Sequence, residues 1–548
     1  MSLNIGRFVL AFLIACVLLL LVDNFTYTIF QFGIITSSGI WRAAYGLLFL
    51  ILVYLAFREC SPLIKPMNET GYRKKHWQIL TAFGLIAISI LSVLTTYLKE
   101  PNQTPNQTNI LSEQKLGSPN IIIIGSDGVD ASHMSLYGYH RETTPWLTNI
   151  AKTALVAENA FANATTSTAS DTSILTGKFP ATTRVIYPPD ILLGENSTQH
   201  LPALLKQMGY YNIEIAIPHY VDAYTVNFKD GFDLVNGRTI QNYPTLYLGW
   251  KIGGDYPAYF IGVTLERILS RLKHIFFVAT IVNPYREVTT GYGMMMNDQE
   301  RIDQLIALLG KSNQPLFAHV HLMGTHGSTY YPINSYFSSG KVQNVPFDTN
   351  YYDDAIRDFD SYLNQLFTFL ENSGILNNTI VVIYSDHGQD YAIDRLPLLF
   401  KFPNDEFAGV IKSNAQNLDI APTLLDYLNL PIPEWMEGDS LLSTDLTEER
   451  PIFTTGVNPS VFTSLEKINQ LDQTLLTPPW YQFGVIQMNV CNYYYQLILI
   501  NDYWDEGRIN HHTASCNPDT LPTTSQARQM ILEHLATHGF DIATLQED

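Results

Sequence analysis

Hydrophobic and polar positions divide the chain into an apolar N-terminal part and a longer part in which short apolar runs alternate with helical stretches. Three apolar runs, at residues 8–22, 43–57 and 79–97, predict membrane-spanning helices, and the third is the clearest of them. A polar segment over 99–117 follows, with a Pro/Asn/Gln/Thr repeat and no apolar period, which predicts a linker. The pattern therefore predicts a transmembrane region over 1–98, joined by this linker to a globular part.

Basic residues predict how the three runs are oriented. They lie before the first run and between the second and the third: Arg7, Arg58, Lys65, Arg73, Lys74 and Lys75. The positive-inside rule makes these segments cytoplasmic. The first run lacks a small-residue cleavage site, which favours an uncleaved anchor over a signal peptide. We expect a multi-pass protein of the inner (plasma) membrane, with everything after residue 97 on the periplasmic or extracellular side.

The globular part alternates strand-like and helix-like patterns. Apolar runs at 119–125, 315–322 and 379–384 predict buried strands, and stretches at 201–208, 299–309 and 352–372 predict helices. This alternation predicts an α/β fold with a mainly parallel sheet flanked by helices, over 118–445. A strand at 493–500 and a helix at 526–538 predict a small C-terminal α+β subdomain over 446–548.

The segment 257–282 has two interpretations. Its apolar positions, among them Leu265, Leu269 and Leu272, form a helical face, and Arg267 and Lys273 lie among the polar positions. A helix that packs inward on the core is the default, and we favour it because most amphipathic helices do so. The alternative is an interfacial helix resting on the bilayer, since its polar face is mostly basic.

Charge and cysteine content narrow the class of protein. The formal net charge is -19 and only 15% of the residues are charged, which argues against a nucleic-acid partner. Four cysteines are too few for a disulfide framework. Cys491 and Cys516 fall in the part expected outside the cytoplasm, where a disulfide would persist, and two free thiols are the alternative.

Two strand ends carry the candidate chemistry. The run 379–384 leads into Ser385-Asp386-His387-Gly388, and the run that begins at residue 119 leads into Asp127-Gly128. Parallel strands place their carboxyl ends at one edge of the sheet, where α/β proteins bind ligands. Two carboxylates and an imidazole at such an edge predict a divalent-metal site.

Both segments resemble the metal-binding motifs of the sulfatase and alkaline-phosphatase superfamily. Further matches follow in the order expected of that superfamily: YGY at 137–139, TPWL at 144–147, SILTGKFP at 173–180, DIAPTLL at 419–425 and GDSL at 438–441. The resemblance covers roughly residues 118 to 445. It implies a metal-dependent enzyme whose nucleophile is a hydroxyl or a modified side chain.

The resemblance also implies the residues of the site. The family's spacing, counted back from Thr176 and Gly177, reaches Ser167 as nucleophile, and Thr166 and Thr168 are the alternatives. If this Ser/Thr-rich stretch instead only caps a helix, Ser170 suits the cap. The implied metal ligands are Asp127, Ser167, Asp386 and His387. This donor set suits Zn²⁺ or Mn²⁺, with Mg²⁺ less favoured, and fits Ca²⁺ poorly.

One departure from the family pattern changes the expected chemistry. Sulfatases convert a Cys or Ser to formylglycine within a motif that ends in arginine, and here Asp171 stands in that place. The chain then looks closest to the membrane-anchored phosphoethanolamine and phosphoglycerol transferases, of which the lipoteichoic acid synthases are examples. These imply a membrane lipid donor, an envelope glycan or lipid acceptor, and two steps through a phospho-enzyme. A sulfuric-ester or phosphoester hydrolase and an inactive binding relic are the alternatives.

Histidines complete the predicted site. His326 follows the strand at 315–322 and resembles the family histidine that contacts the transferred group, as acid or as phosphoryl ligand. His219 is a second candidate, for substrate binding. His319 and His321 alternate along the strand, and we expect them to be satisfied core histidines.

Overall fold

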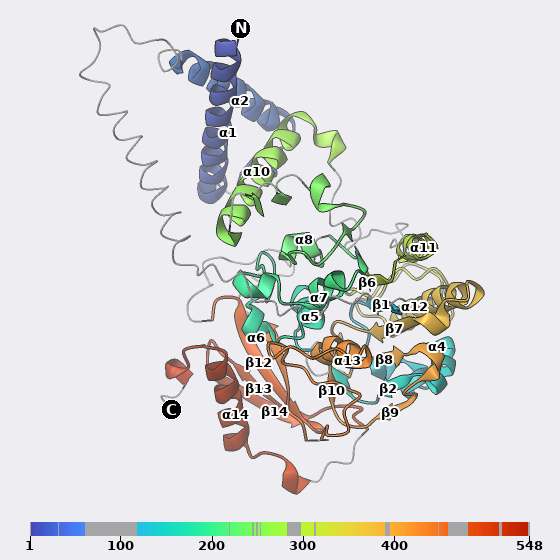
Figure 1. Ribbon diagram of the computed structural model, residues 1–548. Helices are drawn as coiled ribbons and strands as arrows, with labels where there is room; N and C mark the ends of the chain where they lie inside the picture. The colour runs from blue at the N-terminus through green and yellow to red at the C-terminus, as the bar shows by residue number, and fades with distance from the viewer. Residues whose placement is uncertain are drawn as a thin grey trace. The chain divides into compact units, whose positions relative to one another are not determined.

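The computed structural model describes residues 2–30, 32–60, 118–218, 220–243, 246–247, 250–251, 254–281, 298–311, 314–389, 395–447, 449–458, 480–513 and 518–545. These residues form two compact units, both drawn in Figure 1. The first comprises the described residues of Met1–Ile110 and Ile240–Asn283, and the second those of Leu111–Thr239 and Pro284–Asp548. The chain therefore leaves the second unit once and returns to it.

The first unit contains the helices α1 (Ser2–Phe30), α2 (Gly39–Glu59) and α10 (Asp255–Phe276). Within the described residues, α1 and α2 are long and apolar enough to cross a membrane, and they contain the predicted runs 8–22 and 43–57. Only about a fifth of each apolar window is buried, so they are not the core helices of a soluble protein. They indicate a membrane protein. The predicted run 79–97 and the linker 99–117 lie outside the described residues.

We predicted one continuous domain over 118–445. Helix α10 lies within this range, but it belongs to the first unit. Its residues Ile268, Leu272 and Ile275 pack on the apolar cluster that α1 and α2 share. The helix is amphipathic as predicted, but its apolar face packs in the first unit and not in the core of the second.

The second unit is built on an eight-stranded sheet in the order β5-β4-β6-β1-β7-β8-β2-β9. Its strands are, in chain order, β1 (Asn120–Ser126), β2 (Leu155–Ala157), β4 (Tyr211–Ile215), β5 (Leu234–Val235), β6 (Leu316–Leu322), β7 (Thr379–Tyr384), β8 (Leu398–Lys401) and β9 (Gly409–Ile411). Pairing is parallel from β5 through β7, and β8 runs antiparallel to both of its neighbours. The prediction of a mainly parallel α/β sheet is confirmed.

Helices cover both faces of this sheet, and the two faces differ in chemistry. On one face, alternate residues such as Ile122, Val320 and Val381 pack with α4 (Pro145–Ile150), α11 (Asp298–Leu309) and α12 (Thr349–Asn372) in an apolar core. The opposite face carries the other set of alternate residues, which includes His319 and His321, and α5 (Ser167–Thr176) packs there. The strand period of two thus separates a dry core from a polar face.

Shorter elements complete the unit: β3 (Ala160–Phe161) pairs with β10 (Ala415–Gln416), and the helices α6 (Pro180–Thr183), α7 (Leu201–Gln207), α8 (Ala223–Val226) and α13 (Ile420–Tyr427) lie between strands. The C-terminal part is an antiparallel sheet of β11 (Ile452–Val457), β12 (Phe483–Val490), β13 (Tyr493–Ile498) and β14 (Tyr503–Arg508). Helix α14 (Thr524–Thr537) shares its core, as predicted for an α+β subdomain (Figure 1).

The disulfide question is settled for one cysteine. Cys491 is disulfide-bonded, so the free-thiol alternative is wrong for this residue. Cys516 lies outside the described residues.

Candidate active site

The register of the central strands brings the two predicted motifs together. Strand β1 pairs in parallel with both β6 and β7, and Gly125 lies opposite His321 on one side and Tyr384 on the other. Asp127 comes two residues after Gly125, and Asp386 comes two residues after Tyr384. The two aspartates therefore leave adjacent strands at the same edge of the sheet.

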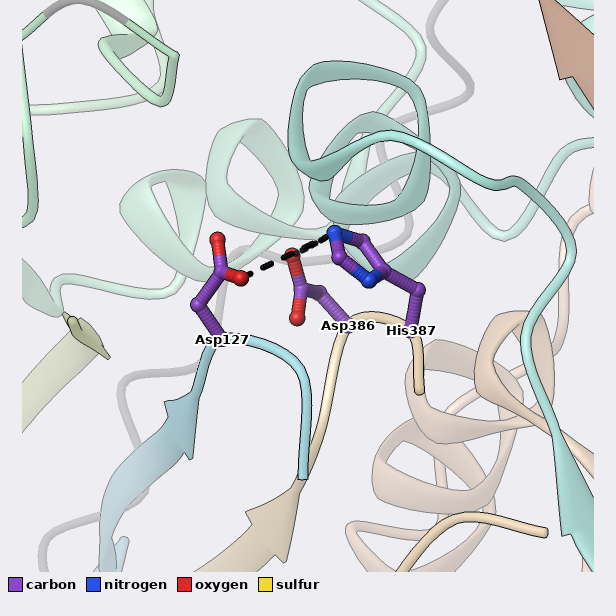
Figure 2. Close-up of side chains that lie close together, drawn as sticks. All are labelled: Asp127, Asp386 and His387. Carbon is purple, nitrogen blue, oxygen red and sulfur yellow. Dashed lines mark ion pairs between the residues drawn. The ribbon is translucent and has the colours of Figure 1, made fainter. Parts of the chain in front are cut away.

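The side chains of Asp127, Asp386 and His387 point toward one another (Figure 2). His387 Nε2 lies 3.4 Å from Asp386 Oδ2 and 3.8 Å from Asp127 Oδ1. One donor atom of each of the three residues lies within 4.8 Å of the other two, and all three residues are buried. The predicted carboxylate, carboxylate and imidazole cluster exists in the folded chain.

Ser167 stands at the first position of α5, beside this cluster. Its Oγ donates a hydrogen bond of 2.9 Å to Asp127 Oδ2. The free N–H groups of a helix's first turn favour an anion near this hydroxyl. All ten residues of α5 are buried, although most are polar. Burial is tolerated because Thr172 and Thr176 donate to the carbonyl oxygens four residues earlier.

The neighbouring hydroxyls have other partners. Thr166 is the N-cap of α5 and donates to the Ile186 carbonyl, and Thr168 Oγ1 donates to the Tyr220 carbonyl at 2.7 Å. The geometry favours Ser167 over both as nucleophile. Ser170 is not the cap, contrary to our expectation, because its Oγ lies a turn into the helix and donates to the backbone carbonyl of Asp386 at 2.6 Å.

Backbone and amide hydrogen bonds hold the two strand ends in place. The Gly128 N–H donates to Asp386 Oδ1 at 3.2 Å, which links the two motifs directly. Asn417 Nδ2 donates to the Ser385 carbonyl at 2.9 Å. Gln389 donates to the carbonyls of Gly128 and Thr325, and so connects the loops after β1, β6 and β7. The backbone is thus held in place at three strand ends, and the Gly128 N–H orients the Asp386 carboxylate.

A buried polar network lies beneath the cluster, on the face of the sheet that α5 covers. His321 Nε2 is 3.6 Å from Asp127 Oδ2 and 4.0 Å from Asp386 Oδ2, and its Nδ1 is 3.3 Å from Asp171 Oδ2. Asp171 Oδ1 lies 3.4 Å from His319 Nε2, and His319 Nδ1 lies 3.3 Å from Glu214 Oε1. Acidic and imidazole groups therefore alternate from the site, past the two histidines of β6, to Glu214 on β4.

Tyr384 closes this network, and Gly125 makes room for it. The Tyr384 hydroxyl donates to Asp171 Oδ1 at 2.7 Å and lies 3.0 Å from His319 Nε2. A Cβ added at Gly125 would lie 2.6 Å from the Tyr384 ring. Only glycine allows the ring to cross β1 at this point.

The charges of these groups shift one another's pKa values. Burial alone would raise the pKa of Asp127, but the charges of His326, His387 and His321 outweigh burial and lower it below its ordinary value. Burial, and then the charge of Asp127, raise the pKa of Asp386. Burial opposes protonation of His321, but the neighbouring aspartates raise its pKa to about 10. His321 is therefore an imidazolium at neutral pH, placed between the site and Asp171.

The residues of the site fit a divalent cation. Two buried carboxylates repel each other, and a cation between them would remove that repulsion. Asp386 Oδ2 is buried and accepts no hydrogen bond from the described residues, so this oxygen has a lone pair to offer. Carboxylate, imidazole and hydroxyl donors together suit a transition metal better than Ca²⁺.

The remaining predicted residues lie around this centre. The charge of His326 acts on Asp127, its Nδ1 is buried without a hydrogen-bond partner among the described residues, and its ring lies 5.7 Å from that of Tyr220. The predicted role of His326 at the transferred group stays a prediction. His219 lies outside the described residues.

Sequence reasoning underrated His319, His321 and Asp171. The two histidines are buried, as expected of core residues, but carboxylates lie on both sides of His321, with Asp171 Oδ2 3.3 Å from Nδ1 and Asp127 Oδ2 3.6 Å from Nε2. A signal was available: two histidines alternate on one strand face, and an acidic residue replaces the family's arginine. Only the packing of α5 on β6 reveals that Asp171 and the two histidines are partners.

Comparison with known proteins agrees with the motifs. The family model described as Sulfatase matches residues 119–430, which is more than half of the chain. The chain is 22% identical over 293 residues to N-acetylgalactosamine-6-sulfatase from Rattus norvegicus, covering 49% of this chain and 50% of that protein. It is 24% identical over 357 residues to phosphoethanolamine transferase EptC from Escherichia coli (strain K12), covering 63% and 53%. The chain spans about half the length of each of these relatives.

Solved structures show the same fold. The chain is similar to the phosphonate monoester hydrolase of Agrobacterium radiobacter, with a TM-score of 0.54 and 15% identity over 77% of this chain and 96% of that one.

Proposed function

Because the chain belongs to the sulfatase family, we propose that it is a membrane-anchored enzyme that transfers or cleaves a phospho-head-group, of phosphoethanolamine or phosphoglycerol type, with unmodified Ser167 as nucleophile. One observation carries the proposal: Ser167 Oγ lies 2.9 Å from Asp127 Oδ2, at a helix N-terminus beside Asp386 and His387. The donor is a membrane phospholipid, and the acceptor is an envelope glycan, a lipid or water.

The replacement of the family's arginine by Asp171 supports phosphoryl over sulfuryl chemistry. Asp171 is buried against His319 and His321. These imidazoles stabilise a negative charge at this position and disfavour a guanidinium. Without the arginine, the formylglycine motif is incomplete. One relative is named a phosphoethanolamine transferase, and others are named sulfatases.

Asp127, Asp386 and His387, together with Ser167, would hold a divalent cation. Such a cation lowers the pKa of a bound hydroxyl and offsets the charge of a phosphodiester. The chain's own groups orient the reaction. The Ser167 hydroxyl has Asp127 as its hydrogen-bond acceptor, and the first turn of α5 faces the incoming anion with N–H groups.

The first step forms the bond between Ser167 Oγ and phosphorus and breaks the bond between phosphorus and the lipid alcohol. The serine proton leaves along its hydrogen bond to Asp127, and His326 supplies a proton to the departing alcohol. In the second step an acceptor hydroxyl or water attacks phosphorus and gives its proton to His326, the bond between phosphorus and Ser167 Oγ breaks, and Oγ takes back the proton from Asp127. Transfer and hydrolysis differ only in the acceptor.

The test uses the full-length chain in detergent micelles, with head-group-labelled phosphatidylethanolamine and phosphatidylglycerol in one arm and an aryl sulfate in the other. Mass spectrometry of the peptide that contains Ser167 detects any covalent adduct on this residue. We expect turnover of one phospholipid and a phosphorylated head-group fragment on Ser167, both lost in Ser167→Ala. The matched control is Thr168→Val, which should retain the adduct. Among the described residues, the Thr168 hydroxyl has a hydrogen bond only to the Tyr220 carbonyl. Formylglycine at position 167 with aryl sulfate turnover would overturn the proposal, and so would inactivity on all substrates with metal bound.

A further inference from the structure

Helix α10 lies in the sequence between two segments of the catalytic unit, but it packs with the helices that can span the membrane. It belongs to the same compact unit as α1 and α2, although more than 190 residues separate it from α2 in the chain. Its Ile268, Leu272 and Ile275 pack on the apolar cluster of α1 and α2, and the Phe276 ring lies 6.0 Å from the Phe49 ring.

An ion pair fixes α10 to α1. Arg271 Nε donates to Asp23 Oδ2 at 2.8 Å, and Asp23 Oδ1 accepts from the Ile34 N–H at 2.6 Å. Asp23 is 3% exposed and lies within the apolar helix α1. A carboxylate inside a membrane-spanning helix is costly unless it is paired. The partner of this one comes from α10.

The contacts lie at the depth of the apolar stretches. A Cβ added at Gly46 would lie 3.3 Å from Ile275 Cγ2. Gly46 and Phe49 are roughly 10 and 15 Å along α2 from its start at Gly39, at 1.5 Å per residue. Asp23 is roughly 10 Å from the end of α1 at Phe30, by the same rise. The contacts therefore lie in the halves of α1 and α2 that adjoin the loop 32–38. The positive-inside rule assigns this loop to the outer side of the membrane.

Several large apolar side chains of α10 stay exposed in this position. Leu269 is 50% exposed and Phe276 is 45% exposed. These two are seven residues apart and so lie about 20° apart around the helix, whereas Arg267 lies roughly 180° from Phe276. Phe260, at 70%, is exposed toward the N-terminal end of the helix, on the side of Arg267 and not on that of Leu269 and Phe276. Large apolar side chains are therefore exposed on α10 and also on the two helices that it packs against, where Leu21 and Leu50 are examples.

We infer that α10 is embedded in the outer leaflet of the membrane, with Leu269 and Phe276 in contact with phospholipid acyl chains and Arg267 turned toward the head groups. The occupant is lipid and not a protein, because α10 packs directly on two helices that can span a membrane and exposes large apolar side chains beside them. Segment 240–283 thereby ties the catalytic unit to the bilayer at a point separate from the linker after α2. The contact with lipid is independent of the reaction that the enzyme catalyses.

Photocrosslinking in liposomes tests the inference. The full-length chain carries p-benzoylphenylalanine at position 269, 276 or 267 and is reconstituted in phosphatidylcholine with a radiolabelled acyl chain. We expect labelled lipid on the chain at 269 and 276, several-fold above the matched control at 267. Equal labelling at the three positions would overturn the inference, as would adducts to protein in place of lipid at 269 and 276.

A second measurement needs no variant. The wild-type chain is irradiated in liposomes that contain a phospholipid with a diazirine-bearing acyl chain, and its peptides are mapped by mass spectrometry. We expect lipid adducts in α10, at or near Leu269–Phe277, as well as in α1 and α2. Labelling of α1 and α2 with none in α10 would show that α10 does not contact lipid, whatever the catalytic activity of the sample.

Discussion

Asp171 offers the sharpest test of the buried network, because it is the residue by which the chain departs from the sulfatase motif. Its carboxylate is 2% exposed and lies 3.3 Å from His321 Nδ1 and 3.4 Å from His319 Nε2. The substitution Asp171→Asn keeps the volume and an acceptor for the Tyr384 hydroxyl, but it removes the charge that offsets two imidazoles. Breaking one side of a buried ion pair costs about 3–5 kcal/mol.

The retained hydrogen bond places Asp171→Asn at the lower end of that range, at about 3 kcal/mol. For a unit of about 400 residues, an unfolding entropy of roughly 2 cal/mol/K per residue converts this loss to a fall in Tm of about 4 °C. The assay is thermal unfolding of the full-length chain, with a chelator present so that changes in metal affinity do not enter the Tm.

The matched control is Asp303→Asn, an exposed carboxylate on α11, for which we expect a change below about 1 °C. Adding His319→Gln to Asp171→Asn should cost less than the sum of the two single changes, because the charge pair is already broken. The reasoning is refuted if Asp171→Asn is as stable as the wild type, or if the two changes are additive.

Three further predictions concern the metal, the nucleophile and acid stability. Replacement of His321 by Asn should weaken metal binding about 10- to 100-fold, because His321 orients both aspartates, and an unchanged Kd in calorimetric titration would contradict this. Ser167→Ala should lower kcat by roughly 10⁴-fold or more while the chain still binds metal; comparable turnover in this variant would move the nucleophile elsewhere. His200 caps α7 through Nδ1, and burial lowers its pKa to about 4. The unfolded chain, with an ordinary pKa near 6.5, binds the extra proton first, so stability falls by up to about 3 kcal/mol as pH drops from roughly 6.5 to 4. In His200→Asn, which keeps a capping oxygen, the plot of Tm against pH should be flatter in this window, and an unchanged slope would exclude His200 as the cause.

The sequence by itself determined the elements whose patterns are local. The runs at 379–384 and 315–322 became the buried strands β7 and β6, and the polar sequence after each apolar strand identified Asp127, Asp386 and His387 as neighbours at one edge. Parallel strand pairing makes that inference possible, because it brings carboxyl ends together regardless of their distance in the chain. The family spacing pointed to Ser167 among four adjacent hydroxyls.

Only the tertiary structure decided matters that depend on which faces meet. The alternation of His319 and His321 shows that they share a face, but the packing of α5 on that face makes Asp171 their partner. Likewise, the period of α10 shows an apolar stripe, and a stripe fits a domain core as well as it fits a membrane helix. Its contacts with Asp23, Gly46 and Phe49 show that it packs on α1 and α2. The sequence could not predict this, because contacts between residues far apart in the chain leave no mark on the local pattern.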